Sequence, residues 1–423
     1  MSALVELNDF VQADNGVFHA RENSEPVAYT DGATTEHQLN QILRNATDLS
    51  SNSAELQSNV SDWPSEYHLS STRANLLRAL NLEGVSRILE LGCGCGSITR
   101  YLGEMTGVQV DSVEGSPSRA ALAALRCRNQ DNVTISTANF NDVQLPEDYY
   151  DLVLYVGVTE YAGRFSSDQS DQAALQNLLL MAKTACKASG VTLIAIENRL
   201  GLKYMLGANE DHYAEKFIGL DNYPDSTGIR TYSKGEWQQQ IEFAGFPAWR
   251  FLYPFPDYKI PTLIVTDAAM RGVSDDQAQN PFDRGLDTES QEEFFKALGQ
   301  FQSRDYISDF VCQNEDKQWQ ALHQAGTFDQ HANSFLILLG DSSERLLSMS
   351  DFTFKAFEVS RFDYLDEVSS AIDEDEQSAS ADAQRIELKN QLSAVSNELQ
   401  LLKGSKGWRL LNVFRRLLGN KPH

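Results

Sequence analysis

Residues 87–104 read RILELGCGCGSITRYLGE, and this stretch decides the fold. Its apolar start predicts a buried strand, and three alternating glycines, Gly92, Gly94 and Gly96, then lead into a helix that begins near Ser97. Glycine is needed where the backbone must adopt a positive φ or approach a ligand closely. The free N–H groups at the start of the following helix favour a polar or anionic group. The stretch therefore predicts a strand, a ligand-binding loop and a helix.

The spacing of this loop is GxGxG, whereas dinucleotide-binding loops use GxGxxG. A carboxylate at Glu90, directly before the loop, would repel a pyrophosphate but could organise a loop that holds a cationic or zwitterionic ligand. Glu114 ends the next predicted strand, where a carboxylate can accept both hydrogens of a ribose diol. These features argue against a nicotinamide dinucleotide and for a positively charged nucleoside ligand.

From 85 to about 266, short apolar runs alternate with helical stretches, which is typical of a doubly wound, mostly parallel sheet. A further apolar run is expected to return to the sheet as a final antiparallel strand. The fold class is thus α/β, with a Rossmann-like sheet of seven strands. The predicted strands cover 86–92, 108–115, 132–139, 150–158, 191–198, 248–255 and 334–340.

Changes in composition divide the chain further. We expect a polar, partly disordered arm over 1–60 and the core over 61–266, followed by a helical insertion over 267–330. Residues 331–364 should supply the final strand and an edge hairpin, residues 365–383 an acidic linker, and residues 384–423 a short coiled coil with a basic amphipathic tail.

The composition excludes several classes of protein. The 423 residues include 60 acidic and 35 basic ones, and a net charge of −25 opposes general binding to nucleic acid. Hydrophobic residues make up 41%, which excludes a wholly disordered chain. Since no apolar run approaches the roughly 20 residues of a membrane span, we expect a cytoplasmic protein. The five cysteines suggest no disulfide framework, and the histidines show no metal-ligand spacing, so no metal is expected.

The stretch ELGCGCG followed by VDSVEGSP resembles motif I and its successor in class I S-adenosylmethionine-dependent methyltransferases. The resemblance covers about residues 65–265 and implies S-adenosylmethionine as the cofactor. Many members of the family have Asp at the position of Asn139, where an amide can still meet the adenine edge. The expected cofactor contacts are Glu90, Gly92, Cys93, Gly94, Gly96, Glu114, Gly115, Asn139, Phe140 and Val156, with Tyr67 and Arg73 closing over the cofactor carboxylate or capping the sheet edge.

A second set of stretches narrows the resemblance: YHLSSTRANLLR (67–78), VGVTEYAG, IENRLGLKY (196–204), EDHY (210–213), RTYSKGEW (230–237) and YPFPDYKIP (253–261). Together they are similar to methyltransferases encoded with bacterial O-antigen and other surface-polysaccharide genes. This resemblance implies methyl transfer to a hydroxyl or phosphate of a lipopolysaccharide-type glycan, or of its nucleotide- or lipid-linked sugar precursor. Some relatives carry a kinase, but neither an HRD-type loop nor a DFG motif occurs in this sequence.

Methyl transfer is an in-line displacement that depends strongly on proximity. A sugar hydroxyl also profits from a general base, whereas a phosphate oxygen needs none. The candidate bases are His212, with Asp211 or Glu210 beside it, and Glu160, although a surface role for His212 is the alternative. The candidate substrate contacts are Tyr161, Asn198, Arg199, Tyr253, Asp257, Tyr258 and Lys259, with core packing or an ordinary turn as the alternative.

The C-terminal segment has a distinct pattern. Leu388, Leu392, Val395, Leu399 and Leu402 follow the rhythm of a coiled coil, which could form a homo-oligomer. Residues 403–423 carry six cations and no acid among apolar residues, and they resemble tails of polysaccharide glycosyltransferases and their partners. Such a tail could bind the inner face of the cytoplasmic membrane, a glycosyltransferase partner or the protein's own domain.

Two rival functions remain open. The same cofactor could serve a small metabolite or a protein side chain as the methyl acceptor. Alternatively, the domain could be a scaffold without activity that recruits glycan enzymes through its C-terminal helix. The intact glycine loop and Glu114 argue against the scaffold.

Overall fold

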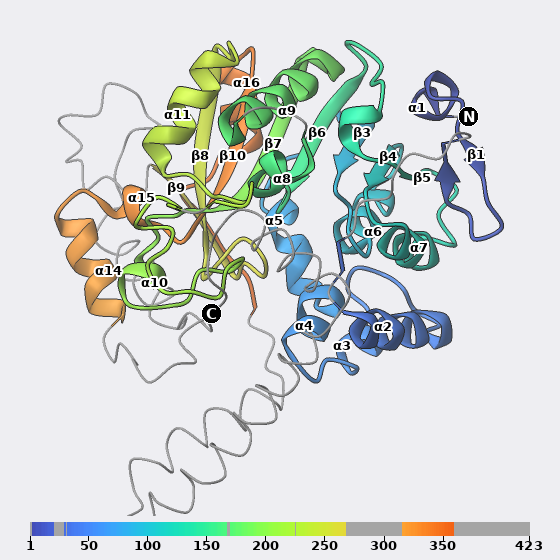
Figure 1. The fold of residues 1–423 in the computed structure, drawn as a ribbon, viewed down its shortest axis with the longest axis horizontal. Helices are drawn as coiled ribbons and strands as arrows, with labels where there is room; N and C mark the ends of the chain where they lie inside the picture. The colour runs from blue at the N-terminus through green and yellow to red at the C-terminus, as the bar shows by residue number, and fades with distance from the viewer. Residues whose placement is uncertain are drawn as a thin grey trace, which may run out of the picture. The chain divides into compact units, whose positions relative to one another are not determined.

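The computed structural model describes residues 2–20, 29–30, 32–166, 170–224, 226–267 and 315–358. The chain divides into two units, Met1–Ser360 and Arg361–His423, and every described residue belongs to the first. The predicted acidic linker (365–383) and coiled-coil tail (384–423) therefore lie outside the described residues, as does most of the predicted insertion. The described part is built around one mixed β-sheet (Figure 1).

Five parallel strands form the centre of the sheet, in the order β5-β4-β3-β6-β7. The strand order reverses between β3 and β6, and in open α/β sheets ligands bind at such a switch point, beyond the carboxyl ends of the strands. The glycine loop begins at that end of β3. The bounds are β3 Arg87–Leu91, β4 Gln109–Glu114, β5 Val133–Thr137, β6 Tyr150–Val156 and β7 Cys186–Glu197.

The strand β10 (Ser334–Gly340) runs antiparallel between β7 and β8 (Ala248–Phe255), as the sequence predicted for residues 334–340. The predicted count of seven strands was too low, because four short strands extend the sheet to eleven. These are β1 (Val11–Gln12) and β2 (Phe18–His19) at one edge, and β9 (Leu263–Thr266) and β11 (Phe354–Ala356) at the other. The edge hairpin expected within 331–364 falls partly outside the described residues; in the described part, β11 pairs with β9.

The two faces of the sheet bury separate hydrophobic cores, because successive side chains of a strand point to opposite faces. Leu152 and Leu154 pack on one face with α5 (Asn75–Arg78), α6 (Ser97–Gly103) and α16 (Ser343–Met349). Val153 and Tyr155 pack on the other with α9 (Asp171–Ala185) and α11 (Lys234–Phe243). The near-continuous apolar strands of the sequence follow from this burial on both faces.

Ordered elements also occur where a partly disordered arm was expected. Residues 2–60 contain α1, β1, β2, α2 and α3, and Leu39 and Leu43 of α2 are buried with Leu122 of α7. The remaining helices have the following bounds: α1 Ala3–Leu7, α2 Ala33–Asn45, α3 Ala54–Gln57, α4 Trp63–Leu69, η1 Ser71–Ala74, α7 Pro117–Arg126, η2 Phe140–Asp142, η3 Thr159–Tyr161, α8 Ala162–Phe165, α10 Leu202–Met205, α14 Glu315–Gln324 and α15 Phe328–His331.

From residue 315 onward the structure describes the end of the predicted insertion, which forms the helices α14 and α15 and packs on the sheet. Trp319 of α14 and Phe328 of α15 contact each other and Phe255 of β8, with ring centroids 4.9–5.4 Å apart. Among the described helices, none has the length and apolar character needed to cross a bilayer.

Gly96 provides a test of why the loop requires glycine. Its φ is +78°, and a Cβ there would lie 2.8 Å from Cα of Ala123 on α7, so Gly96→Ala adds an overpacking cost to the conformational one. Gly84 has nearly the same φ, +80°, with open space around it, and Gly84→Ala measures the conformational cost alone. We expect urea unfolding to show a loss of about 1–2 kcal/mol for Gly84→Ala and about 1–3 kcal/mol more for Gly96→Ala. Equal losses would contradict close packing between α6 and α7.

Candidate active site

The glycine loop between β3 and α6 forms the floor of the site. Gly92, Gly94 and Gly96 all have positive φ, at +85°, +53° and +78°. A Cβ on Gly92 would lie 2.3 Å from Cγ2 of Val158, which leaves no room for a side chain. The loop therefore presents bare backbone to the adjoining hollow, as close approach to a ligand requires.

Glu114, the last residue of β4, holds this loop in place. Its Oε2 accepts a hydrogen bond from the backbone N–H of Gly94 at 2.7 Å, and its Oε1 accepts one from that of Ser116 at 2.9 Å. A carboxylate has about four acceptor positions, so Glu114 retains capacity for two further hydrogens, such as those of a ribose diol.

Glu90 lies beneath the loop, where it is only 2% exposed. Its Oε2 accepts hydrogen bonds from the hydroxyls of Thr99 on α6, at 2.6 Å, and Ser112 on β4, at 3.2 Å. Burial raises the pKa of Glu90 to about 7. Glu90 thus ties β3 to the helix that follows the loop, in keeping with its predicted part in orienting the loop.

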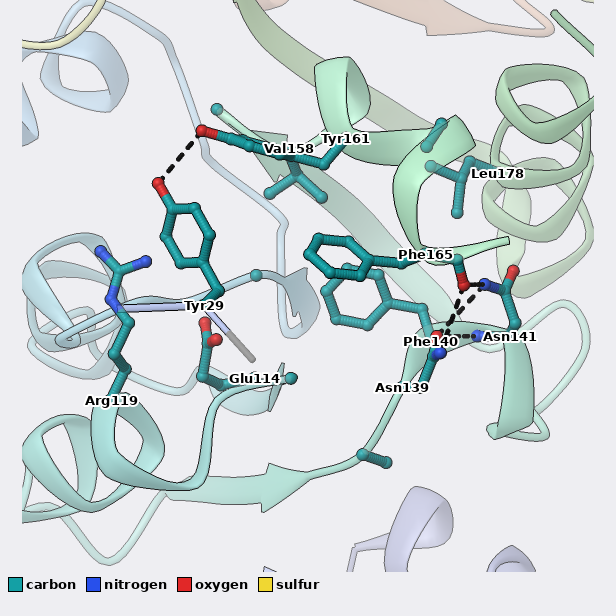
Figure 2. Close-up of a pocket in the computed structure, with 15 residues that line it drawn as sticks. Tyr29, Glu114, Arg119, Asn139, Phe140, Asn141, Val158, Tyr161, Phe165 and Leu178 are labelled. Atoms are coloured by element: carbon teal, nitrogen blue, oxygen red, sulfur yellow. Dashed lines mark hydrogen bonds between the residues drawn. The ribbon is translucent and has the colours of Figure 1, made fainter. Parts of the chain in front are cut away.

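The first hollow, called here the nucleoside pocket, lies beyond β4 and β5 (Figure 2). Its lining combines Glu114 and Gly115 with apolar side chains that include Phe140 and Phe165. Asn139 accepts a hydrogen bond from the N–H of Asn141 at 3.1 Å and donates one to the carbonyl of Phe165 at 3.3 Å. A lining with aromatic side chains of this kind suits a flat heterocycle, with Glu114 placed for a ribose.

Tyr29 closes the nucleoside pocket from the N-terminal segment. Its hydroxyl lies 3.1 Å from that of Tyr161, and the two rings meet edge to face with centroids 5.2 Å apart (Figure 2). The guanidinium of Arg119 stacks over the ring of Tyr29 at 4.8 Å. No local sequence signal indicated Tyr29 or Arg119, because their place depends on contacts between distant parts of the chain.

The second hollow, called here the polar cleft, adjoins the first and has a cavity volume of about 340 Å³. Predicted site residues that line it are Tyr67, Arg73, Glu90, Gly92, Cys93, Gly94, Val156, Glu160, Tyr161, Asp211, His212, Tyr258 and Lys259. Arg73 stacks over Tyr67 at 4.3 Å and donates to its hydroxyl at 2.8 Å. A second bond from Arg73 to the carbonyl of Lys259, at 2.7 Å, joins two walls of the cleft.

His212 lies between two carboxylates of the polar cleft. Its Nδ1 is 3.0 Å from Oε1 of Glu210, and its Nε2 is 3.6 Å from Oε1 of Glu160. Although burial opposes the charged form, these two carboxylates raise the pKa of His212 well above its usual range. Of the two neighbours considered for His212 from sequence, Glu210 is the partner. A histidine that holds its proton so strongly is poorly suited to act as a base.

Asp211 belongs to a separate group of charges. Its two oxygens pair with Lys203 at 2.9 Å and Lys259 at 3.0 Å, and Tyr204 donates to it as well. Although burial opposes ionisation, the two lysines hold the pKa of Asp211 well below its usual range. Asp211 therefore balances lysine charge, and the predicted pairing of Asp211 with His212 does not occur among the contacts of the described chain.

Sequence analysis missed Glu197, the last residue of β7. Its side chain is fully buried and lines the polar cleft, Lys259 donates to its Oε1, and burial raises its pKa to about 7. A signal was available, because a glutamate at the carboxyl end of a parallel strand faces the ligand edge of the sheet. A general base works best with a pKa near the working pH, so Glu197 fits that task better than His212.

Four predicted substrate contacts lie outside the lining of both hollows. Asn198 donates to the carbonyls of Gln330 and Ala332, and Arg199 forms an ion pair with Glu236 at 2.7 Å. The hydroxyl of Tyr253 accepts a bond from Lys234 at 2.7 Å, and Asp257 pairs with Lys203 at 3.0 Å. These contacts hold the scaffold together. The sequence positions of these residues led to the prediction that they contact the substrate, but the packing of the fold determines where each side chain points.

Part of the predicted core is similar to known proteins. Residues 88–181 match a family model described as a methyltransferase domain. Cyclopropane-fatty-acyl-phospholipid synthase of Escherichia coli K12 is 29% identical over 139 residues, which are 33% of this chain and 32% of that enzyme. The same enzyme of a second Escherichia coli strain gives the same values. The aligned region spans about a third of the length of these curated relatives.

Solved structures of methyltransferases also align with the chain. One is the S-adenosylmethionine-dependent methyltransferase of Mesorhizobium loti, at 17% identity and a TM-score of 0.36 over 63% of this chain and 97% of that one. Another is phosphoethanolamine N-methyltransferase 2 of Haemonchus contortus, at 16% identity and a TM-score of 0.35 over 64% and 52%.

The class of domain follows from the family match together with the glycine loop and Glu114. Residues 88–181 are similar to a methyltransferase domain. This match supports S-adenosylmethionine as the cofactor. The bare loop backbone, the carboxylate of Glu114 and the apolar lining of the nucleoside pocket fit a ligand that contains adenosine.

The raised pKa of Glu90 predicts a pH dependence of stability. The folded chain holds this proton with a pKa of about 7 against 4.5 for a free side chain, so the free energy of unfolding falls as pH rises through that window. In Glu90→Gln this decline should be shallower, by up to about 1.4 kcal/mol per pH unit. The amide can still accept from Thr99. Urea unfolding at several pH values measures the slope, with the exposed Glu83→Gln as control. A slope in Glu90→Gln equal to that of the wild type would contradict the assignment.

Proposed function

We propose that this protein transfers the methyl group of S-adenosylmethionine to a hydroxyl or phosphate oxygen of a bacterial surface polysaccharide or its sugar precursor. The observation that carries the proposal is the meeting of two hollows at the glycine loop. Tyr29, Gly92, Arg119, Gly157 and Tyr161 line both of them. A cofactor whose adenosine occupies the nucleoside pocket therefore has its sulfonium end beside the polar cleft.

The electrostatics of the polar cleft support a cationic cofactor. When bound, the cofactor supplies a methyl group on a positively charged sulfonium, and two carboxylates of the cleft lining, Glu160 and Glu197, each keep one oxygen that accepts no hydrogen bond from the described residues. Carboxylates in a partly buried site attract a cation more strongly than they would in water. Arg73 offers a guanidinium to the carboxylate end of the cofactor, consistent with the role expected from the sequence.

The lining of the polar cleft also supports a polar acceptor. Charged and phenolic side chains such as Tyr161, His212, Tyr258 and Lys259 suit an acceptor with several hydroxyls. The second candidate is a lipid acceptor, because the curated relative is by name a fatty-acyl-phospholipid synthase. An acyl chain in this cleft would bury carboxylates and ammonium groups against hydrocarbon without compensation, which is strongly unfavourable. The glycan is therefore the better candidate.

The tail completes the proposal. Residues 384–423 would hold the enzyme at the inner face of the cytoplasmic membrane or against a glycosyltransferase, beside a lipid-linked glycan. The six cations of 403–423, interleaved with apolar residues, support binding to an anionic surface. Co-sedimentation with anionic vesicles, compared between the full chain and a chain that ends at residue 383, tests this part of the proposal.

Glu114 offers the most direct test of the cofactor site. Glu114→Gln can still accept the bond from Gly94 but loses the charged bidentate acceptor, so it should fold and bind S-adenosylhomocysteine at least about tenfold more weakly. Glu114→Ala also loses the bond to the loop and should bind more weakly still. Calorimetric titration measures both, with Glu83→Gln as control. Unchanged affinity in both variants would remove Glu114 from the cofactor site.

The acceptor is tested by transfer of labelled methyl groups. Surface polysaccharide from cells that lack this protein should take up label from S-adenosylmethionine when the full chain is added, and polysaccharide from wild-type cells should take up much less. Phospholipid vesicles and a pool of small metabolites serve as competing acceptors. Label that enters only lipid or small molecules would contradict the glycan proposal, while leaving the cofactor assignment intact.

A further inference from the structure

Three potential metal ligands meet at the wall of the polar cleft. Glu160 comes from η3, Glu197 from the end of β7, and His212 from the loop after α10. One ligand atom of each lies within 4.8 Å of those of the others. Their side chains are 2%, 0% and 6% exposed. Spacing along the chain gave no sign of this group, because its members belong to three separate elements.

His212 is held in the orientation that a metal ligand requires. Its Nδ1 lies 3.0 Å from Glu210, and Glu210 also accepts bonds from the backbone N–H of His212, at 2.7 Å, and Tyr213, at 2.9 Å. The hydroxyl of Tyr223 donates to the same carboxylate at 3.1 Å. Metal-bound histidines almost always donate their second ring N–H to such a partner. The arrangement turns Nε2 of His212 toward Glu160.

The two carboxylates each keep one oxygen without a partner. Oε2 of Glu160 and Oε2 of Glu197 are buried and accept no hydrogen bond within the described part of the chain. A buried carboxylate oxygen without a hydrogen-bond donor is costly. The two carboxylates each bring an oxygen within 4.8 Å of the other, and like charges at this distance repel unless a cation compensates them.

The charge of the surroundings also favours a cation. Lys259 donates to Oε1 of Glu197, which leaves Oε2 of that residue available. The other charged groups linked to the site do not neutralise it, because carboxylates outnumber ammonium groups. The linked carboxylates and ammonium groups are Glu160, Glu197, Glu210, Asp211, Asp257, Lys203 and Lys259.

We propose that Glu160, Glu197 and His212 bind a divalent metal ion, which displaces the proton from Nε2 of His212 to solvent, with Glu210 as the positioning residue for His212. Two carboxylates and one imidazole suit first-row ions such as Mn²⁺, Fe²⁺ and Zn²⁺. Three protein ligands leave coordination positions open toward the polar cleft. An oxygen of the acceptor can take one of them; this last step rests on the proposed function, whereas the metal site itself does not.

Titration of the full chain with Mn²⁺, followed by electron paramagnetic resonance of the free ion, tests the site. We expect one tight site per chain, weakened at least about 100-fold in Glu197→Gln and in His212→Gln, and about 10–100-fold in Glu210→Gln. Zn²⁺ should displace the bound Mn²⁺. The surface variant Glu83→Gln should bind as the wild type does. Equal, weak binding by all these chains would overturn the site.

A second measurement on the wild type does not depend on the folding of any variant. Electron spin-echo modulation of bound Mn²⁺ should show coupling to a single imidazole nitrogen, and an absence of nitrogen coupling would overturn the proposal. Titration with S-adenosylhomocysteine in the same samples separates the two claims. Cofactor binding without Mn²⁺ binding would sink the metal site and leave the proposed function standing. Mn²⁺ binding without cofactor binding would support the metal site and contradict the proposed function.

Discussion

The hydrogen bond from the backbone N–H of Gly94 to Glu114 joins the ends of two neighbouring strands, and the site depends on it. It fixes a loop whose glycines adopt a conformation that other residues rarely adopt, and it leaves part of the Glu114 carboxylate for a ligand. Glu90 supports the same loop from below through Thr99. The strand order reverses beside this loop, so the sheet opens where the loop presents its backbone.

The polar cleft concentrates charge that a folded chain would otherwise avoid. Removing charges from water is costly unless they are paired. Lys203 and Lys259 pair with Asp211 and Asp257, which accounts for part of the charge. Glu160 and Glu197, which line the cleft, each keep one oxygen without a partner among the residues that the structure describes. Such uncompensated groups are typical of functional sites, because a ligand supplies the compensation that the fold lacks.

The centre of the fold was predictable from sequence for physical reasons. Strands buried on both faces read as apolar runs, and a loop that needs positive φ reads as glycine. The edge strands β1 and β2 were missed because two residues each are too short to show a period. In the site, the loop glycines and Glu114 follow from local sequence. Tyr29 does not, because a distant segment brings it to the pocket, whereas Glu197 at the end of β7 carried a sequence signal that was overlooked.

The central claim is that the two hollows form an S-adenosylmethionine site. Calorimetric titration of the full chain with S-adenosylhomocysteine, with NAD as control, tests it most directly. The account predicts one site with micromolar affinity, about −8 kcal/mol, for S-adenosylhomocysteine and no detectable binding of NAD. Equal binding of the two ligands, or binding of NAD alone, would contradict it.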